Sequence, residues 1–171
     1  MYQIDMHDRV VELTDIPRME SGAPLPKLVT NEDGLDLIYL LDEPDPNWDG
    51  STATMVSPDT ERAKIACIRF DATWAHMLGP PNDEALAGHP LARRGLSHYA
   101  VFEILHSSWV RSLERMNAVH PNHSPEMFAN LRHFIFTFHD ETFECVARGY
   151  KFRIAKGSIT SVAASLPSAW R

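Results

Sequence analysis

The stretch RHFIFTFHDETFECVA, residues 132–147, decides the fold of this chain. Phenylalanine recurs at every second position of its first half, and a period of two is typical of a strand that buries one face. A second apolar stretch follows after a short polar segment. The pattern therefore predicts a β-hairpin with strands at 132–138 and 143–147, joined by a turn at 139–142.

Working outward from the hairpin, similar patterns predict several more strands. They lie at 10–13, 35–41, 63–74, 98–106 and 150–154. Ser107-Ser108 begins a predicted helix over 109–119, and Ser124-Pro125 begins a short one that ends near residue 131. Strands outnumber helices, and the hairpins imply antiparallel pairing. We expect an α+β fold in which two helices pack on one antiparallel, barrel-like sheet.

The 171 residues suit a single domain spanning 1–171. Residues 42–60 are rich in acidic and turn-forming residues and predict a long acidic loop. The tail, 157–171, is small and polar, which predicts a flexible end or one amphipathic turn.

Charge and composition exclude several function classes. The first 60 residues hold 13 acidic and only 3 basic side chains. Nucleic acids and anionic membranes bind mainly through Lys and Arg, so neither is an expected partner. No apolar run has the length of a membrane helix, and no secretory signal is recognised. Cys67 and Cys145 lie in apolar runs, which favours free thiols in a reducing, cytoplasmic compartment.

Two segments, GPPNDEALAGHPL and HFIFTFHDETFECVA, resemble segments of a set of small uncharacterised bacterial proteins. The resemblance lies in the second half of the chain and implies a bacterial, cytosolic origin. It implies no activity, cofactor or catalytic residue.

The common catalytic motifs are missing from the sequence. It contains no GxGxxG, Walker A, GxSxG, HExxH or EF-hand pattern. Candidate sites must therefore be argued from single polar residues within apolar strands.

Glu103 is the first such residue, because both faces of its predicted strand are apolar. A buried carboxylate has either a raised pKa, as a general acid or base requires, or a charged partner. We favour a structural ion pair, and Arg69 is its expected partner. Glu144 lies within the strand 143–147 and is similarly unexpected there.

His139 lies beside Asp140 at the predicted hairpin turn, where an imidazole and a carboxylate could act as a base and its orienter. Metal ligation is the alternative, and His89, His139 and Glu144 are its candidate ligands for a divalent metal. A solvated turn is the third possibility for these side chains.

The loop from Asn82 to His89 is restricted by prolines and glycines, which favours a preorganised binding loop. An N-cap at Asn82 with Asp83 in a first helical turn is the structural alternative. His89 has no role in that alternative.

Two functions from different classes remain. The first is a small-molecule-binding protein or enzyme whose pocket lies where loop 79–90 meets the sheet, with Glu103 and His139 as the acid/base pair. The expected pocket walls and ligand-binding residues are Trp74, Tyr99, Phe102, Trp109, Arg69, Asn82, Asp83, His89 and Arg132. The second is an acidic interaction module, such as an immunity, adaptor or inhibitor protein. A homodimer fits either function.

Overall fold

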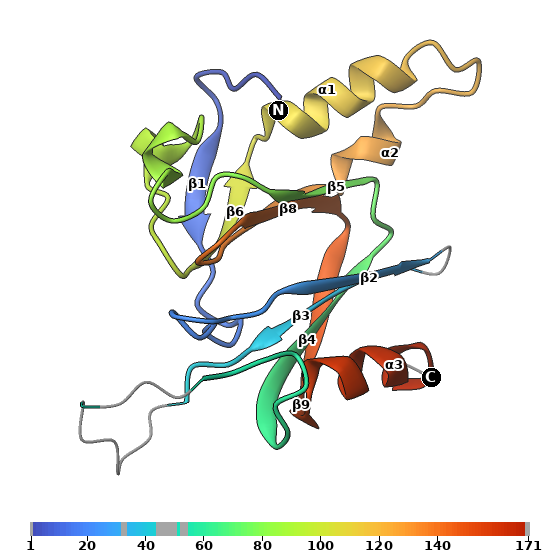
Figure 1. The fold of residues 1–171 in the computed structure, drawn as a ribbon. Helices are drawn as coiled ribbons and strands as arrows, with labels where there is room; N and C mark the ends of the chain where they lie inside the picture. Colours follow the sequence, from blue (N-terminus) through green and yellow to red (C-terminus); the bar gives the residue numbers. More distant parts are fainter. Residues whose placement is uncertain (1, 32–33, 44–50, 52–54, 170–171) are drawn as a thin grey trace.

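The computed structural model describes residues 2–31, 34–43, 51 and 55–169. Two antiparallel sheets stack face to face, with helices on both outer sides (Figure 1). The α+β class and the antiparallel pairing are confirmed. The described strands form two open sheets rather than one barrel-like sheet.

The first sheet has the order β1-β6-β7-β8-β5. Its strands are β1 Arg9–Glu12, β5 Ala75–Gly79, β6 Val101–Leu105, β7 Arg132–Thr137 and β8 Thr142–Ala147. The second sheet has the order β2-β3-β4-β9. Its strands are β2 Lys27–Asn31, β3 Gly34–Leu40, β4 Ala63–Asp71 and β9 Gly149–Gly157.

Three α-helices and two 3₁₀ turns complete the fold. They are α1 Ser108–Asn117, α2 Glu126–Ala129, α3 Ile159–Ala169, η1 Leu86–Gly88 and η2 Ala92–Arg94. Helix α1 begins as expected, with the Ser107 hydroxyl accepting a hydrogen bond from the backbone N–H of Val110.

The predicted hairpin is confirmed as β7 and β8, with Phe136 opposite Phe143. Beyond β8 the chain passes through Arg148 into β9 and so crosses from the first sheet to the second. This crossing brings the start of β7 near the start of β9.

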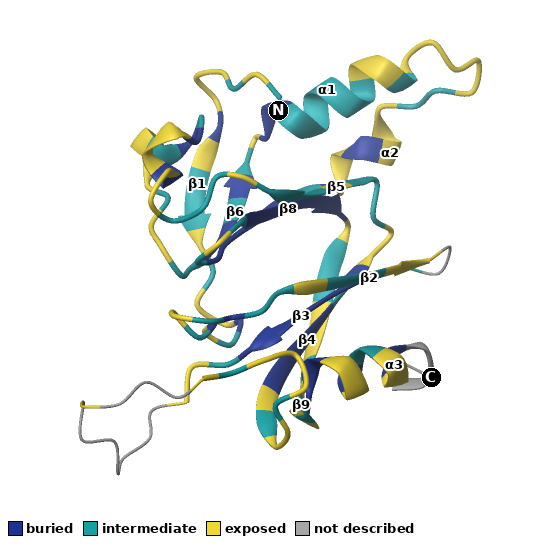
Figure 2. Ribbon diagram, viewed as in Figure 1, coloured by how far each residue is buried: buried dark blue, intermediate teal, exposed yellow. Residues whose placement is uncertain are grey.

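The main core lies between the sheets, where alternate residues of each strand meet (Figure 2). Phe136 contacts Tyr39 of β3 and Phe70 of β4, with ring centroids 6.2 and 6.0 Å apart. The opposite residues of β4, such as Cys67, pack under α3 instead. Strands β4 and β8 are buried on both faces, so apolar residues occur on both, as Ala66 and Cys67 do on β4.

Some predicted elements are wrong. The tail contains α3, whose Ile159, Val162 and Leu166 are buried against the second sheet, so it is not a flexible end. Small residues separate these three apolar side chains in the sequence, which weakens the helical pattern. The three side chains are buried because the helix packs on the second sheet. The described residues consequently form three α-helices rather than the expected two. Strands β2 and β5 were missed because they are short edge strands with weak alternation.

Two other expectations concern the acidic loop and the thiols. Most of the predicted loop 42–60 lies outside the described residues. Cys67 and Cys145 are buried free thiols, as expected, and burial raises the pKa of both, that of Cys67 to about 11.

Replacing Phe136 with Ala should lower the free energy of unfolding by about 3–5 kcal/mol, because it leaves a cavity between the sheets. Phe152 on β9 is 40% exposed, so Phe152→Ala is a matched control that should cost less than about 1 kcal/mol. Urea unfolding followed by circular dichroism measures both. If both variants lost the same free energy of unfolding, the main core would not lie between the sheets.

Candidate functional site

Three of the residues singled out above meet beside the turn between β7 and β8. Asp83 Oδ2 lies 2.8 Å from His139 Nδ1 and accepts a hydrogen bond from the Tyr99 hydroxyl at 2.5 Å. The Tyr99 hydroxyl is also 3.2 Å from His139 Nδ1. We call Asp83, Tyr99 and His139 the turn cluster.

Backbone hydrogen bonds hold the proline-rich loop against this turn. The N–H of Asp83 donates to the carbonyl of His139 at 2.9 Å, and the hydroxyl of Thr142 donates to the carbonyl of Pro81 at 2.8 Å. Asn82 Oδ1 accepts from the N–H of Ala85 at 3.1 Å, as an N-capping residue would. Asn82 therefore shapes the loop, and the loop positions the Asp83 carboxylate.

Tyr99 reaches the turn cluster from a strained backbone. Its φ of +56° lies in the left-handed region that bulky residues avoid. The N–H of Tyr99 donates to the carbonyl of Thr137 at 3.0 Å, and the Thr137 hydroxyl donates to the carbonyl of Ser97 at 2.8 Å. These bonds fix the strained conformation, and such strain is concentrated at functional sites.

Hydrogen bonding determines the protonation of the turn cluster. The hydrogen bond from Tyr99 lowers the pKa of Asp83, and the same bond raises the pKa of Tyr99 to about 12. The carboxylate can only accept, so His139 Nδ1 carries a proton. In the neutral imidazole Nε2 is then a free base, 4.0 Å from the exposed Asp140 carboxylate. The carboxylate that contacts the imidazole most closely is that of Asp83 rather than that of Asp140, and Asp140 is exposed as in the solvated-turn alternative.

Tyr99 also contributes to the wall of a cavity of about 290 Å³. The segment between β1 and β2 also lines this cavity, with Thr14 and Arg18 among its residues. The side chain of His139 is 41% exposed and that of Asp83 is 14% exposed. The imidazole is therefore more accessible to solvent than the carboxylate, and the cavity is lined by Tyr99 but not by His139 or Asp83.

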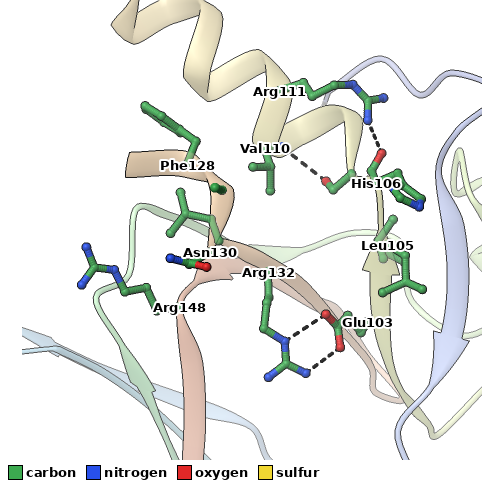
Figure 3. Close-up of a pocket in the computed structure, with 13 residues that line it drawn as sticks. Glu103, Leu105, His106, Val110, Arg111, Phe128, Asn130, Arg132 and Arg148 are labelled. Carbon is green, nitrogen blue, oxygen red and sulfur yellow. Dashed lines mark hydrogen bonds and ion pairs between the residues drawn. The ribbon is translucent and has the colours of Figure 1, made fainter. Parts of the chain in front are cut away.

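Glu103 forms an ion pair with Arg132, not with Arg69 (Figure 3). Arg132 Nε donates to Oε1 at 2.9 Å, and Nη2 donates to Oε2 at 2.5 Å. Arg69 lies on β4 in the other sheet, with Nη1 3.5 Å from Asp36 Oδ2. The structural ion pair is thus present, but its partner comes from the neighbouring strand β7, within cross-strand reach of Glu103.

The structure does not bring Glu103 and His139 together as an acid/base pair. Glu103 is opposite Phe134, and His139 is five residues further along the chain, roughly 16 Å away if extended. The predicted aromatic pocket is also divided. Tyr99 packs between the sheets, whereas Phe102, Trp74 and Trp109 lie on the outer face of the first sheet.

A second polar cluster is buried on that outer face, around Glu144. Its Oε2 accepts hydrogen bonds from Tyr2 at 2.7 Å and His133 Nε2 at 2.8 Å, and its Oε1 lies 3.1 Å from His89 Nε2. Burial alone would raise the pKa of Glu144, but the hydrogen bonds from the two imidazoles lower it to about 2. Glu144 is therefore an anion with three donors.

The tautomer of each imidazole follows from the contact of its Nδ1, the ring nitrogen that does not face Glu144. His89 Nδ1 accepts from the N–H of Leu91 at 3.1 Å, so its proton is on Nε2. His133 Nδ1 lies 2.9 Å from the Ser107 hydroxyl, and burial lowers the pKa of His133. Both rings are thus neutral donors to Glu144. Trp109 stacks on Tyr2 at 5.2 Å and closes the cluster.

The three expected metal ligands do not converge. His89 and Glu144 bond to each other in the buried cluster, while His139 belongs to the turn cluster. Within the described ranges, no group of three or more His, Cys, Asp and Glu side chains is arranged to hold a metal ion. Tyr2 has no distinctive pattern around it in the sequence, and the one indication of its role is Glu144, an acid within an apolar strand that requires buried donors.

Comparison with protein families, curated proteins and solved structures finds no match to this chain. Among the helices of the described residues, none has the length and apolarity to cross a membrane.

Replacing Glu144 with Gln should lower the free energy of unfolding by about 3 kcal/mol, because the amide N–H₂ of Gln would face a buried N–H donor. Glu84→Gln, at an exposed position of the loop, is the control and should change little. Urea titration measures both. If Glu144→Gln were as stable as the native chain, Glu144 would not be the buried anion that holds its three donors together.

Acid should destabilise the chain through His133. Its folded pKa is lowered from the ordinary value of 6.5, so the unfolded chain takes up a proton that the folded chain does not. The free energy of unfolding should therefore fall as the pH drops below about 6.5, and Glu144 should extend the loss below its ordinary value of 4.5.

The variant His133→Gln keeps a donor for Glu144 but does not titrate. Its unfolding free energy should fall less between about pH 7 and 5 than that of the native chain. The exposed His120, replaced by Gln, should retain the native slope. An undiminished slope in His133→Gln would show that other groups cause the acid sensitivity.

Proposed function

We propose that this chain is a small-molecule enzyme that transfers protons at the turn cluster. The observation that carries the proposal is the single Asp83 oxygen that binds both the His139 imidazole and the Tyr99 hydroxyl, with Tyr99 held in a strained conformation. Carboxylate–imidazole pairs of this kind orient and activate a general base.

Each member of the turn cluster has a distinct role in the proposal. Asp83 fixes the Nδ1–H tautomer of His139, which leaves Nε2 to take a proton from a substrate or a water molecule. The imidazolium that forms is stabilised by the Asp83 carboxylate. Tyr99 shares that carboxylate and is one of the residues that line a cavity of about 290 Å³. A substrate that uses this cavity must be small.

A cytoplasmic location and a homodimer remain part of the proposal. The two buried free thiols support a reducing compartment. The alternative function, an acidic interaction module, rests on the acidic first third of the chain, on the loop 42–60 and on the missing catalytic motifs. The contacts of the turn cluster support the enzyme hypothesis.

A panel of chromogenic esters, amides and phosphomonoesters tests the proposal. We expect turnover of one class by the native chain, and His139→Gln should lower kcat by about 10²–10⁴-fold because the base is lost. Asp83→Asn should also lower kcat, since an amide can favour the wrong tautomer. His120→Gln is the matched control and should keep full activity.

The pH–rate profile separates catalysis from folding. Turnover should rise with the deprotonation of one group, and that limb should disappear in His139→Gln while thermal melting stays cooperative. Unchanged turnover in His139→Gln would overturn the proposal. So would a loss of turnover no larger than the loss of folded protein, as measured by thermal melting.

A further inference from the structure

Ser107 stands at the junction of β6 and α1, next to the buried cluster around Glu144. Its hydroxyl lies 2.9 Å from His133 Nδ1, and His133 Nε2 lies 2.8 Å from Glu144 Oε2. A hydroxyl, an imidazole and a carboxylate thus form one continuous hydrogen-bonded chain. Hydrolytic triads are recognised by such geometry and not by sequence position, so the missing GxSxG motif does not argue against one.

The direction of these hydrogen bonds suits a nucleophile. The Glu144 carboxylate only accepts, so the proton of the neutral His133 imidazole is on Nε2 and Nδ1 is an acceptor. The Ser107 hydroxyl therefore donates to Nδ1. Capping of α1 does not compete with this bond, because the N–H of Val110 donates to a lone pair of the same hydroxyl at 3.3 Å. In the serine proteases Nε2 faces the serine instead, but the imidazole accepts the hydroxyl proton in the same way.

The position of Ser107 is fixed on both sides along the chain. His106 has a φ of +54°, in the left-handed region that is uncommon for residues with a side chain, and its carbonyl accepts a hydrogen bond from Arg111 Nη1. On the other side, the N–H of Ser108 donates to Asp8 Oδ1 at 2.6 Å. Such strain is concentrated at functional sites, and a strained strand-to-helix turn also carries the nucleophile of α/β-hydrolases.

Ser107 is one of the residues that line a pocket of about 660 Å³ (Figure 3). This volume is within the range of small-molecule sites. The lining combines apolar side chains, such as Leu105 and Leu131, with polar ones, such as Asn130. Because Ser107 is only 5% exposed, this pocket is the route by which a small molecule would reach it.

Both charges that form when a hydroxyl attacks a carbonyl meet an opposite charge here. A carbonyl attacked by Ser107 would lie at the N-terminus of α1, a helix of ten residues. The positive end of the helix dipole stabilises the negative charge that develops on the carbonyl oxygen. His133 becomes an imidazolium in the same step, and the ionised Glu144 beside it stabilises that positive charge.

We propose that Ser107, His133 and Glu144 hydrolyse small carboxylic esters through an acyl-enzyme. Ser107 Oγ attacks the carbonyl carbon while its proton passes to His133 Nδ1. The bond to the alcohol then breaks, and the leaving oxygen takes that proton. A water molecule repeats the sequence on acyl-Ser107, which releases the carboxylic acid and restores the hydroxyl. The site is separate from the turn cluster and does not depend on the function proposed for it.

Labelling with a fluorophosphonate tests the proposal on the native chain. The reagent phosphonylates a serine hydroxyl that a base activates, with loss of fluoride. We expect the label on Ser107, mapped by peptide mass spectrometry. Ser107→Gly, with a residue that is tolerated at an N-cap, should not be labelled. Ser108→Ala is the matched control and should be labelled as the native chain is, because it removes a buried hydroxyl that has no partner among the described residues.

The rate of labelling tests the base and the carboxylate. His133→Gln keeps a donor for Glu144 but lacks the base, so it should be labelled at least about 100-fold more slowly. Glu144→Asp keeps the negative charge and should retain more of the rate than Glu144→Gln. The rates are compared at a temperature at which circular dichroism shows each variant to be folded.

An ester substrate completes the test. p-Nitrophenyl butyrate should release a burst of p-nitrophenol and leave an acyl group on Ser107. The turn cluster contains no serine, so the mapped adduct distinguishes the two sites. An unlabelled native chain, a label on another residue or an unchanged rate in His133→Gln would overturn the proposal. Equal rates in the two Glu144 variants would overturn the role of the carboxylate, and an ester that is neither cleaved nor transferred to Ser107 would overturn the substrate class.

Discussion

The buried carboxylate of Glu144 is the interaction on which the outer layer of the first sheet depends. An ion removed from water is tolerated only when its hydrogen bonds are satisfied. Its donors, Tyr2, His89 and His133, come from three different segments. The carboxylate thereby fixes the N-terminal segment and the loop before β6 against the sheet. Ser107 extends the same network to α1, since its hydroxyl contacts His133 and also caps that helix.

The β7–β8 hairpin carries three polar systems that strand geometry keeps apart. Adjacent residues point to opposite faces, so Arg132 lies toward the second sheet while His133 lies toward Glu144. His139 follows the end of β7 and meets the loop instead. The turn cluster and the Glu103–Arg132 ion pair are thus separated by the length of one strand. A substitution at one site should leave the other intact.

Much of this arrangement could be predicted from local pattern. The alternation of apolar residues predicts the hairpin strands β7 and β8 and the strand β6, and Ser107 predicts the start of α1. Asp83, Tyr99 and His139 could be named as candidates, because polar residues stood in a restricted loop or beside apolar strands. Their partners could not be predicted. His139 has an acid next to it in sequence, yet it binds Asp83 because the loop docks on the turn.

The docking of that loop explains why the turn cluster is preorganised. One point of attachment is Asp83, whose N–H and carboxylate both bind His139. The other is His89, held in the buried cluster by Glu144 and by the N–H of Leu91. A loop fixed on both sides loses little further entropy when a ligand arrives, so the orientation of the imidazole is set in advance. The stability supplied by Glu144 therefore contributes to the geometry of the turn cluster at the end of β7.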